Sequence, residues 1–318
     1  MLAICVECSH QRGMGNLFRS LNIAHWLDEH GIKYIFLIND DQKSLAYLNK
    51  RAIEYEVVDL WDYDSNWEKV CIGKYHINRW INDRMATDAR HAAHVKNCGV
   101  KLCTFDDTGG GAAYADQNFC PMVLERHDRL EGKEVFSGSA YMILNPEISL
   151  YRRARKEKKR ILITLGGSDT YGVSVQVVDA VKRLPYDFTV VTGYCFGHEA
   201  ELEQAALDSK VQIIRTVPSM MEYFSHFDMA ITGGGVTPFE AIASGLPCVI
   251  VANEHHEEQV GRFFAKSGCA AYLGYYQDAA YSRLGEYLRN SNVSAMSARA
   301  LDLLKMDGLE NVMTEIMR

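Results

Sequence analysis

Three glycine-rich segments of this sequence combine small residues with hydroxyl and carboxyl side chains. They occupy residues 12–19, 166–169 and 232–240, and read Arg-Gly-Met-Gly-Asn-Leu-Phe-Arg, Gly-Gly-Ser-Asp and Thr-Gly-Gly-Gly-Val-Thr-Pro-Phe-Glu. Glycine lets a backbone approach a ligand closely, and the N–H groups at a helix start attract anions. The segments therefore predict a phosphate or diphosphate ligand, with tight strand-to-helix turns and helix caps as the structural alternatives.

The third segment ends in an acidic residue whose position has two explanations. Thr237, Pro238 and Glu240 form the pattern of a capping box, with proline at the first helical position. The three glycines before them exceed what a helix cap requires. A carboxylate at this helix start could also accept two hydrogen bonds from ribose hydroxyls. We therefore favour nucleotide binding over a purely structural cap here.

Acidic residues follow two predicted strands of the first half, where a base could act. Asp106 and Asp107 follow the predicted strand 100–105, and Asp83 follows the predicted strand 80–82. Aspartate also favours caps and turns, so a catalytic role and a structural role both stay open for these positions.

Two segments resemble metal-binding patterns without the spacing that metal sites need. Residues 253–259 read Asn-Glu-His-His-Glu-Glu-Gln, but HExxH-type spacing is absent, so polar recognition of a sugar is favoured. Cys5 and Cys8 form C-x-x-C on a predicted strand, where positions three apart point to opposite faces. We expect no metal, and we expect most of the nine cysteines to be buried free thiols.

Short apolar segments alternate with helical patterns in both halves of the chain. This alternation predicts an α/β fold with two Rossmann-like parallel-sheet domains facing a cleft. Ligands of such sheets bind beyond the carboxyl ends of the strands, which is where the candidate residues fall. The predicted strands are 2–7, 34–38, 56–60, 80–82, 100–105, 160–165, 188–192, 211–215, 228–231 and 247–252, and the main helices are 17–30, 86–97, 173–183, 198–207, 220–226, 238–244 and 257–267.

The expected domains are residues 1–148, on the acceptor or sugar side, and residues 149–306, which would bind the nucleotide. Residues 307–318 are expected to form a helix that packs back on the first domain. Near the boundary, seven of the nine residues Arg152–Arg160 are basic. A solvated helix end is favoured there, and a patch that contacts phosphate or a membrane surface is the alternative.

The composition excludes several classes of protein. With 34 basic and 41 acidic residues among 318, the formal charge of −7 argues against nucleic acid binding through bulk charge. Apolar residues make up 47% of the chain, which is typical of a globular protein. We read no signal peptide and no apolar run of the ~20 residues that a membrane span needs, so we expect a soluble cytoplasmic protein.

Taken in order, these motifs resemble the UDP-sugar hydrolase of pseudaminic acid biosynthesis and the related spore-coat polysaccharide proteins, roughly from residue 3 to 274. The segment 234–240 with Gln259 is also similar to the N-acetylglucosaminyltransferase that makes lipid II. The resemblance implies the glycosyltransferase B (GT-B) architecture. Residues 166–169 and 233–237 would then meet a diphosphate, Glu240 would meet the ribose, and Gln259 would lie nearer the sugar. The ligand-binding candidates are Gly15, Arg19, Gly166, Gly167, Ser168, Asp169, Gly233, Gly234, Gly235, Val236, Thr237, Glu240, His255 and Gln259.

One position departs from the hydrolase, which has a histidine, taken to assist attack of water, where this chain has Asn16. Asparagine cannot act as a base at neutral pH, although it can hold a phosphate or a sugar hydroxyl. The base would then be His10, Asp83, Asp106 or Asp107, and His10 has the ordinary pKa best suited to the task.

The sequence therefore favours a glycosyltransferase that uses a UDP- or CMP-linked sugar in surface polysaccharide, flagellin glycan or nonulosonic acid assembly. The first alternative is a hydrolase that releases free sugar, and the second is a nucleotide-sugar binding protein without catalysis. The strand end Asn-Asp-Arg at 82–84, where the hydrolase has an Asp-x-Tyr-like pattern, favours transfer. We expect no metal and no separate cofactor, because helix N-termini would stabilise the departing diphosphate. The expected partners are the nucleotide sugar and a glycan, lipid-linked or protein acceptor.

Overall fold

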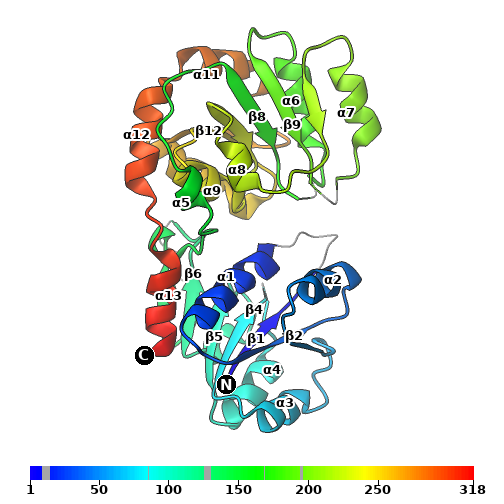
Figure 1. Cartoon of the computed structure of the whole chain (residues 1–318), viewed down its shortest axis with the longest axis vertical. Helices are drawn as coiled ribbons and strands as arrows, with labels where there is room; N and C mark the ends of the chain where they lie inside the picture. The colour runs from blue at the N-terminus through cyan, green and yellow to red at the C-terminus, as the bar shows by residue number, and fades with distance from the viewer. Residues whose placement is uncertain (9–14, 85, 125–129, 168, 194–195) are drawn as a thin grey trace. The chain divides into compact units, whose positions relative to one another are not determined.

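The computed structural model describes residues 1–8, 15–84, 86–124, 130–167, 169–193 and 196–318 of the chain. These residues form two compact units, each with its own parallel sheet (Figure 1). Unit 1 comprises residues 1–143 and 307–318, and unit 2 comprises residues 144–306. The units divide after residue 143, whereas the sequence placed the division after residue 148.

Unit 1 is built on a seven-stranded parallel sheet of order β3-β2-β1-β4-β5-β6-β7. Its strands are β1 Leu2–Val6, β2 Tyr34–Ile38, β3 Tyr55–Val57, β4 Arg79–Asp83, β5 Lys101–Phe105, β6 Gln117–Cys120 and β7 Glu134–Ser137. Its α-helices are α1 Gly15–Glu29, α2 Gln42–Lys50, α3 Trp67–Tyr75, α4 Ala89–Asn97 and α13 Gly308–Met317, with 3₁₀ turns at Ala112–Tyr114 and Ser139–Tyr141.

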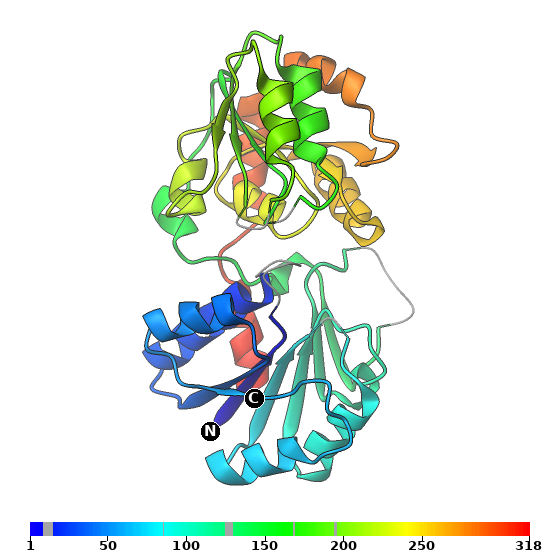
Figure 2. The same ribbon diagram turned by 90° about the vertical axis from the view of Figure 1, so that its right-hand side faces the viewer.

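The pleat of β1 divides the core of unit 1 between two faces of the sheet. Leu2, Ile4 and Val6 pack on one face with buried residues of α1 and α13, whereas Ala3 and Cys5 pack on the other face with α4. Figure 2 shows α3 and α4 on the opposite side of this sheet from α1. Because both faces are buried, β1 is a continuous apolar run rather than an alternating one.

Helix α13 completes the core of unit 1. Val312, Met313 and Ile316 are buried in the cluster that contains β1 and α1. Arg79 of β4 donates hydrogen bonds to the carbonyl oxygens of Ile316, at 2.6 Å, and Met317, at 3.0 Å. The end of the chain is therefore tied to the middle of the unit 1 sheet.

Unit 2 is built on a six-stranded parallel sheet of order β10-β9-β8-β11-β12-β13. Its strands are β8 Arg160–Thr164, β9 Asp187–Val191, β10 Gln212–Ile214, β11 Met229–Thr232, β12 Cys248–Ala252 and β13 Ala270–Tyr275. Its α-helices are α5 Ile148–Tyr151, α6 Val173–Val181, α7 Glu199–Ala206, α8 Met220–Phe224, α9 Thr237–Ala243, α10 Glu258–Lys266, α11 Leu284–Asn290 and α12 Val293–Leu303, with 3₁₀ turns at His255–Glu257 and Tyr281–Arg283.

Each of the ten predicted strands is present, with bounds that differ by a few residues, and the sequence missed β6, β7 and β13. Strand β6 lacks an apolar pattern because its buried residues Gln117 and Asn118 are polar. Their side chains are satisfied by hydrogen bonds, and Gln117 donates to the carbonyl of Glu315 in α13 at 2.8 Å. A partner far away in the sequence thus allows a polar strand to be buried.

The basic segment 152–160 is an extended strap, not the solvated helix end that the sequence predicted. Helix α5 ends at Tyr151, and four of the seven basic side chains donate hydrogen bonds to backbone carbonyls of unit 2. Arg155 is fully buried and binds the carbonyls of Phe224, at 3.0 Å, and Ser244. These carbonyls belong to the ends of α8 and α9, where helices lack internal partners and favour a cation. Contact of this segment with a membrane stays a prediction; none of the described helices has the length and apolarity needed to cross one.

Candidate functional site

Arg19 in α1 links the carboxyl ends of two strands of unit 1. Its Nε and Nη2 donate to Asp83 of β4 at 3.0 and 2.5 Å, and its Nη1 donates to Asp106, after β5, at 2.6 Å. The guanidinium also lies over the ring of Phe105, 4.9 Å from its centroid. Arg19 therefore positions two acidic groups, and the predicted role as a phosphate ligand would require it to leave these carboxylates.

Two of the predicted bases, Asp83 and Asp107, are buried and already engaged. The Asp83 side chain is 0% exposed, and burial raises its pKa. Asp107 is 2% exposed, and its Oδ1 accepts hydrogen bonds from the N–H groups of Thr87, at 3.0 Å, and Gly109, at 2.9 Å. Asp107 thus fixes the turn after β5. Both carboxylates are shielded from solvent in this arrangement, and their catalytic role stays a prediction.

Asp106 is the carboxylate of this group that solvent reaches. Its side chain is 19% exposed, and its φ of +47° lies in the left-handed region that residues other than glycine seldom adopt. The ion pair with Arg19 and a hydrogen bond from its own N–H to the Phe119 carbonyl, at 2.7 Å, hold it there. Asp169 has a similar φ of +43°, so this conformation by itself does not distinguish a chemical role from a structural one.

The start of α1 faces the same strand ends. Asn16, in the first turn, donates from Nδ2 to the backbone carbonyl of Asp83 at 3.4 Å. Gly15 is exposed, and a Cβ placed on it would meet no described atom within 4 Å. Two further predicted site residues, His10 and Ser168, lie outside the described residues.

In unit 2, the loop after β8 exposes an open pair of glycines. Gly166 has a φ of +93°, and a Cβ placed on Gly166 or Gly167 would meet no described atom within 4 Å. The Asp169 side chain, by contrast, is hydrogen-bonded to residues of its own unit. Its carboxylate accepts the N–H groups of Val173, at 2.8 Å, and Ser174, at 2.9 Å, and thereby caps α6. The glycine pair is open to a ligand, whereas Asp169 has a structural role here.

The glycines of the third segment are required by close packing. A Cβ on Gly234 would lie 2.7 Å from the Cβ of Glu257, and a Cβ on Gly233 would lie 3.0 Å from Nδ2 of Asn253. Glu257 Oε2 accepts the N–H groups of Gly234, at 3.1 Å, and Asn253, at 2.7 Å, and burial raises the pKa of this carboxyl. The expectation that Gly233 and Gly234 present bare backbone to a ligand is therefore wrong for this structure. Gly235 lies beside the same carboxylate, with a Cβ position 3.3 Å from its Oε1.

The acidic residue of α9, Glu240, has no partner among the residues that the structure describes. The helix begins at Thr237, Val236 stands at the N-cap position, and no side chain caps the helix. The predicted capping box is therefore wrong, because Thr237 lies inside the helix instead of before it. The Glu240 carboxylate is partly buried, and no hydrogen bond or ion pair reaches it from the described residues. Burial raises the pKa of Glu240 to about 7.

His255 and Gln259 lie on the segment after β12. The His255 ring is exposed, stacks on Tyr275 with centroids 4.2 Å apart, and has its Nδ1 3.1 Å from Oε1 of Glu258. Gln259 is partly buried and donates to the carbonyl of His256 at 3.2 Å. Among the residues that the structure describes, no group of three or more His, Cys, Asp or Glu side chains is arranged to hold a metal ion.

Two relatives resemble the chain at the level of sequence, and no protein-family model matches it. The uncharacterized protein MJ1062 of Methanocaldococcus jannaschii is 26% identical over 308 residues, which cover 89% of this chain and 63% of that protein. The spore coat polysaccharide biosynthesis protein SpsG of Bacillus subtilis is 23% identical over 288 residues, which cover 86% of this chain and 83% of SpsG. The chain thus spans less than two thirds of the archaeal relative.

Solved glycosyltransferases share the fold over the whole chain. MurG of Acinetobacter baumannii has a TM-score of 0.71 with 14% identity, covering 99% of both chains. The glycosyltransferase VinC, solved in complex with dTDP, has a TM-score of 0.65 with 15% identity, covering 100% of this chain and 99% of that one. The two parallel-sheet domains of this protein therefore have the GT-B fold, and the predicted fold class and the resemblance to SpsG and MurG are confirmed.

Proposed function

We propose that this protein is a glycosyltransferase that takes a nucleotide sugar and acts in polysaccharide biosynthesis. The observation that carries the proposal is the Glu240 carboxylate, which is partly buried and has no hydrogen-bond or ion-pair partner among the described residues of unit 2. A buried charge without a partner is costly, so such a group is retained where a ligand supplies donors. SpsG and the glycosyltransferases that share the fold support the same reading.

The two hydroxyls of a ribose fit the chemistry of Glu240. Each hydroxyl donates one hydrogen bond to a carboxylate oxygen, and such charge-assisted bonds are stronger than neutral ones. The open backbone at Gly166 and Gly167 would receive the diphosphate of the same nucleotide. UDP, CMP and dTDP are the nucleotides to test first. UDP and CMP carry a ribose with both hydroxyls and dTDP carries a deoxyribose with one, so comparing their affinities shows whether both hydroxyls contribute to binding.

The reaction we propose is substitution at the anomeric carbon of the sugar. A base takes the proton of the attacking hydroxyl, the new C–O bond forms, and the bond from the sugar to the leaving nucleotide breaks, which is a diphosphate for UDP- and dTDP-sugars and a monophosphate for CMP-sugars. Among the candidate bases that the structure describes, we assign this role to Asp106, because solvent reaches its side chain, whereas the side chains of Asp83 and Asp107 are buried. Backbone N–H groups would stabilise the leaving diphosphate without a metal ion.

Hydrolysis is the second candidate, since the partly exposed Asp106 could also take a proton from water. A hydrolase would release free sugar for nonulosonic acid biosynthesis, whereas transfer requires an acceptor. Purified protein should be incubated with several UDP-, CMP- and dTDP-sugars, with and without polysaccharide or lipid-linked acceptors. Elongated acceptor supports transfer, free sugar supports hydrolysis, and binding without turnover supports a non-catalytic binding protein. The absence of any thermal shift with these nucleotides would overturn all three, because a ligand at a hundred times its Kd stabilises by about 2.7 kcal/mol.

A further inference from the structure

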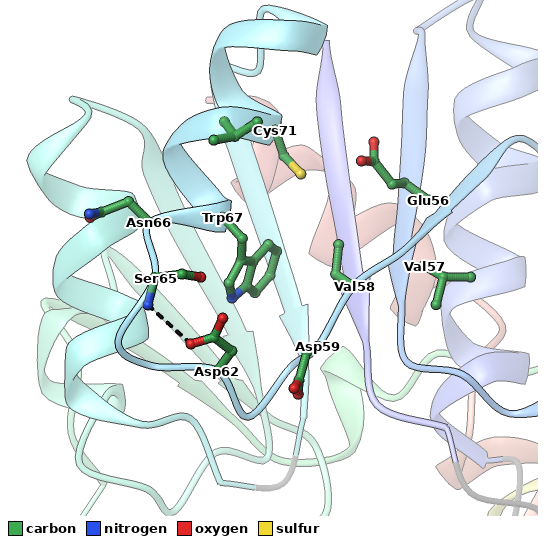
Figure 3. A pocket seen from close by; sticks show the side chains of 10 residues that line it. Glu56, Val57, Val58, Asp59, Asp62, Ser65, Asn66, Trp67 and Cys71 are labelled. Carbon is green, nitrogen blue, oxygen red and sulfur yellow. Dashed lines mark hydrogen bonds between the residues drawn. The ribbon is translucent and has the colours of Figure 1, made fainter.

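Unit 1 has a cavity of about 440 Å³ beside the carboxyl end of its edge strand β3. Figure 3 shows its walls: β3 contributes Glu56 and Val57, the following loop contributes Asp59 and Asp62, and α3 contributes Trp67. Cavities of this size hold small organic ligands. None of these residues takes part in the contacts around Arg19.

One wall of the cavity is apolar and open to solvent. Val57 is 45% exposed and Val70 is 66% exposed, and the Trp67 ring and the Cys71 thiol extend this surface. Burial raises the pKa of Cys71 to about 11, so its thiol is neutral and adds apolar area. Exposed valines clustered around a cavity mark a binding surface more often than single exposed apolar residues do.

The rim of the cavity is acidic. It carries the carboxylates of Glu56, Asp59 and Asp62, and no lysine or arginine is among the described residues that line it. Lys74 lies nearby, but its ammonium group pairs with Oε2 of Glu56 at 2.9 Å. The lining therefore keeps an excess of negative charge beside an apolar wall.

The loop geometry leaves these carboxylates fixed. Asp62 Oδ1 accepts the N–H group of Ser65 at 3.0 Å, the contact dashed in Figure 3, and hydrogen bonding by Ser65 lowers the pKa of Asp62. Asp59 Oδ1 accepts the N–H group of Trp61 at 3.0 Å. The second oxygen of each carboxylate is not used in these turns, so an approaching cation can pair with it.

We propose that this cavity binds an apolar molecule that carries a protonated amine, and that this molecule is the amine-bearing acceptor of the sugar. The identification of this molecule as the acceptor rests on the proposed transferase function. The prediction that the cavity binds an apolar amine does not depend on that function. An apolar body would cover the valines and the indole, and an ammonium group would complement the acidic rim. An anionic lipid surface is disfavoured by the same charges.

The direct test compares three probes of equal length on the full chain: hexylamine, hexanol and hexanoate. Binding is measured at low salt by the chemical shifts of ¹⁵N-labelled protein and by tryptophan fluorescence. We expect the affinities to fall from the amine to the alcohol to the carboxylate, with shifts centred on the residues of the cavity. Equal binding of all three probes, or shifts confined to other parts of the chain, would overturn the inference.

Matched variants locate the charge. Asp59→Asn and Asp62→Asn keep the oxygen that closes each turn, and each should weaken the amine about two- to fivefold without affecting hexanol. Asp64→Asn is the control, because Asp64 lies on the same loop with its side chain 96% exposed and does not line the cavity. If Asp64→Asn lowers the affinity for hexylamine equally, the effect comes from the overall charge of the loop and not from the cavity, and the inference is overturned. Val70→Thr provides a second check, since it should weaken amine and alcohol alike.

The outcomes separate the inference from the proposed function. Nucleotide affinity depends on unit 2, so the cavity variants should leave UDP binding unchanged. If the wild-type protein binds a nucleotide but not hexylamine, the cavity is not an amine site and the inference is refuted. If no nucleotide binds, the transferase function and the acceptor role are both refuted. If the wild-type protein binds hexylamine and the Asn variants lower transfer to an amine-bearing acceptor, both stand.

Discussion

Replacing Glu240 by glutamine should make unit 2 more stable above pH 7 and leave its stability unchanged near pH 4. The pKa of this partly buried carboxyl is raised from 4.5 to about 7, and burial is the cause. Since the folded-state pKa lies above that of the unfolded chain, folding is favoured while the group is protonated. Stability is then lost as the pH rises from about 4.5 to about 7, and the full cost is present above pH 7.

The size of the effect follows from the difference between the two pKa values. Each pKa unit corresponds to about 1.36 kcal/mol, so a rise of roughly 2.5 gives about 3 kcal/mol as an upper bound. Solvent around a partly exposed carboxyl reduces that figure. Glutamine carries no charge, and the Glu240→Gln variant should therefore gain up to about 3 kcal/mol of unfolding free energy at pH 8.5.

The same change should weaken nucleotide binding while it stabilises the fold. Hydrogen bonds to charged groups contribute about 1.5–3 kcal/mol, so the loss of the carboxylate should cost roughly tenfold to hundredfold in affinity for UDP. Because ribose hydroxyls favour the ionised carboxyl, wild-type affinity for UDP should also fall as the pH drops below about 7.

Urea unfolding at pH 5 and pH 8.5, with titration calorimetry of UDP at both pH values, measures these effects. Glu286→Gln is the control, since Glu286 is an exposed residue of α11 in the same unit. The reasoning is refuted if Glu240→Gln and Glu286→Gln have the same pH dependence of stability and the same affinity for UDP. Glu240 would then be an ordinary surface carboxylate.

Four further outcomes are expected. Asn16→His should raise release of free sugar without acceptor by up to about 10²–10⁴-fold, and efficient hydrolysis by the wild type would contradict the preference for transfer. Asp106→Asn should lower turnover by about 10²–10⁴-fold with little change in nucleotide affinity, so equal turnover would remove Asp106 as the base. Chelation with EDTA should leave turnover unchanged, and loss of turnover restored by Mn²⁺ or Mg²⁺ would contradict a metal-independent reaction. Arg155→Met should cost more than about 3 kcal/mol in urea unfolding, because several buried carbonyls lose their donor, whereas exposed Lys156→Met should stay within about 0.5 kcal/mol.

Ten strands of the two sheets could be predicted because parallel strands buried on two faces are continuous apolar runs. Leu2–Val6 and Cys248–Ala252 are such runs. Gln117–Cys120 was missed because its polar residues are buried, and Gln117 is satisfied by α13, a partner that no local pattern indicates. The basic strap was misjudged for the same reason, since the carbonyls that hold Arg155 come from distant helix ends.

The location of the candidate residues near strand ends could be predicted, and the contacts that these residues make could not. Glycine and carboxylate motifs indicated the strand ends correctly, because parallel sheets place their loops there. The roles of Asp169 and Glu257 depend on which N–H groups lie within reach, and that is set by the packing of loops distant in the chain. The sequence of the His-His-Glu-Glu segment does not indicate what its side chains contact. In the structure, Glu257 of this segment accepts a hydrogen bond from the backbone N–H of Gly234.

The docking of α13 in unit 1 has a consequence for how the protein is made. The sheet of unit 1 is encoded in the first 143 residues, but Val312, Met313 and Ile316 reach its core only after all of unit 2 has been synthesised. A nascent chain therefore holds an incomplete apolar face of unit 1 while unit 2, which is continuous in sequence, can already fold. The core of unit 1 is thus completed by the segment that is synthesised after unit 2, whereas unit 2 needs no later segment.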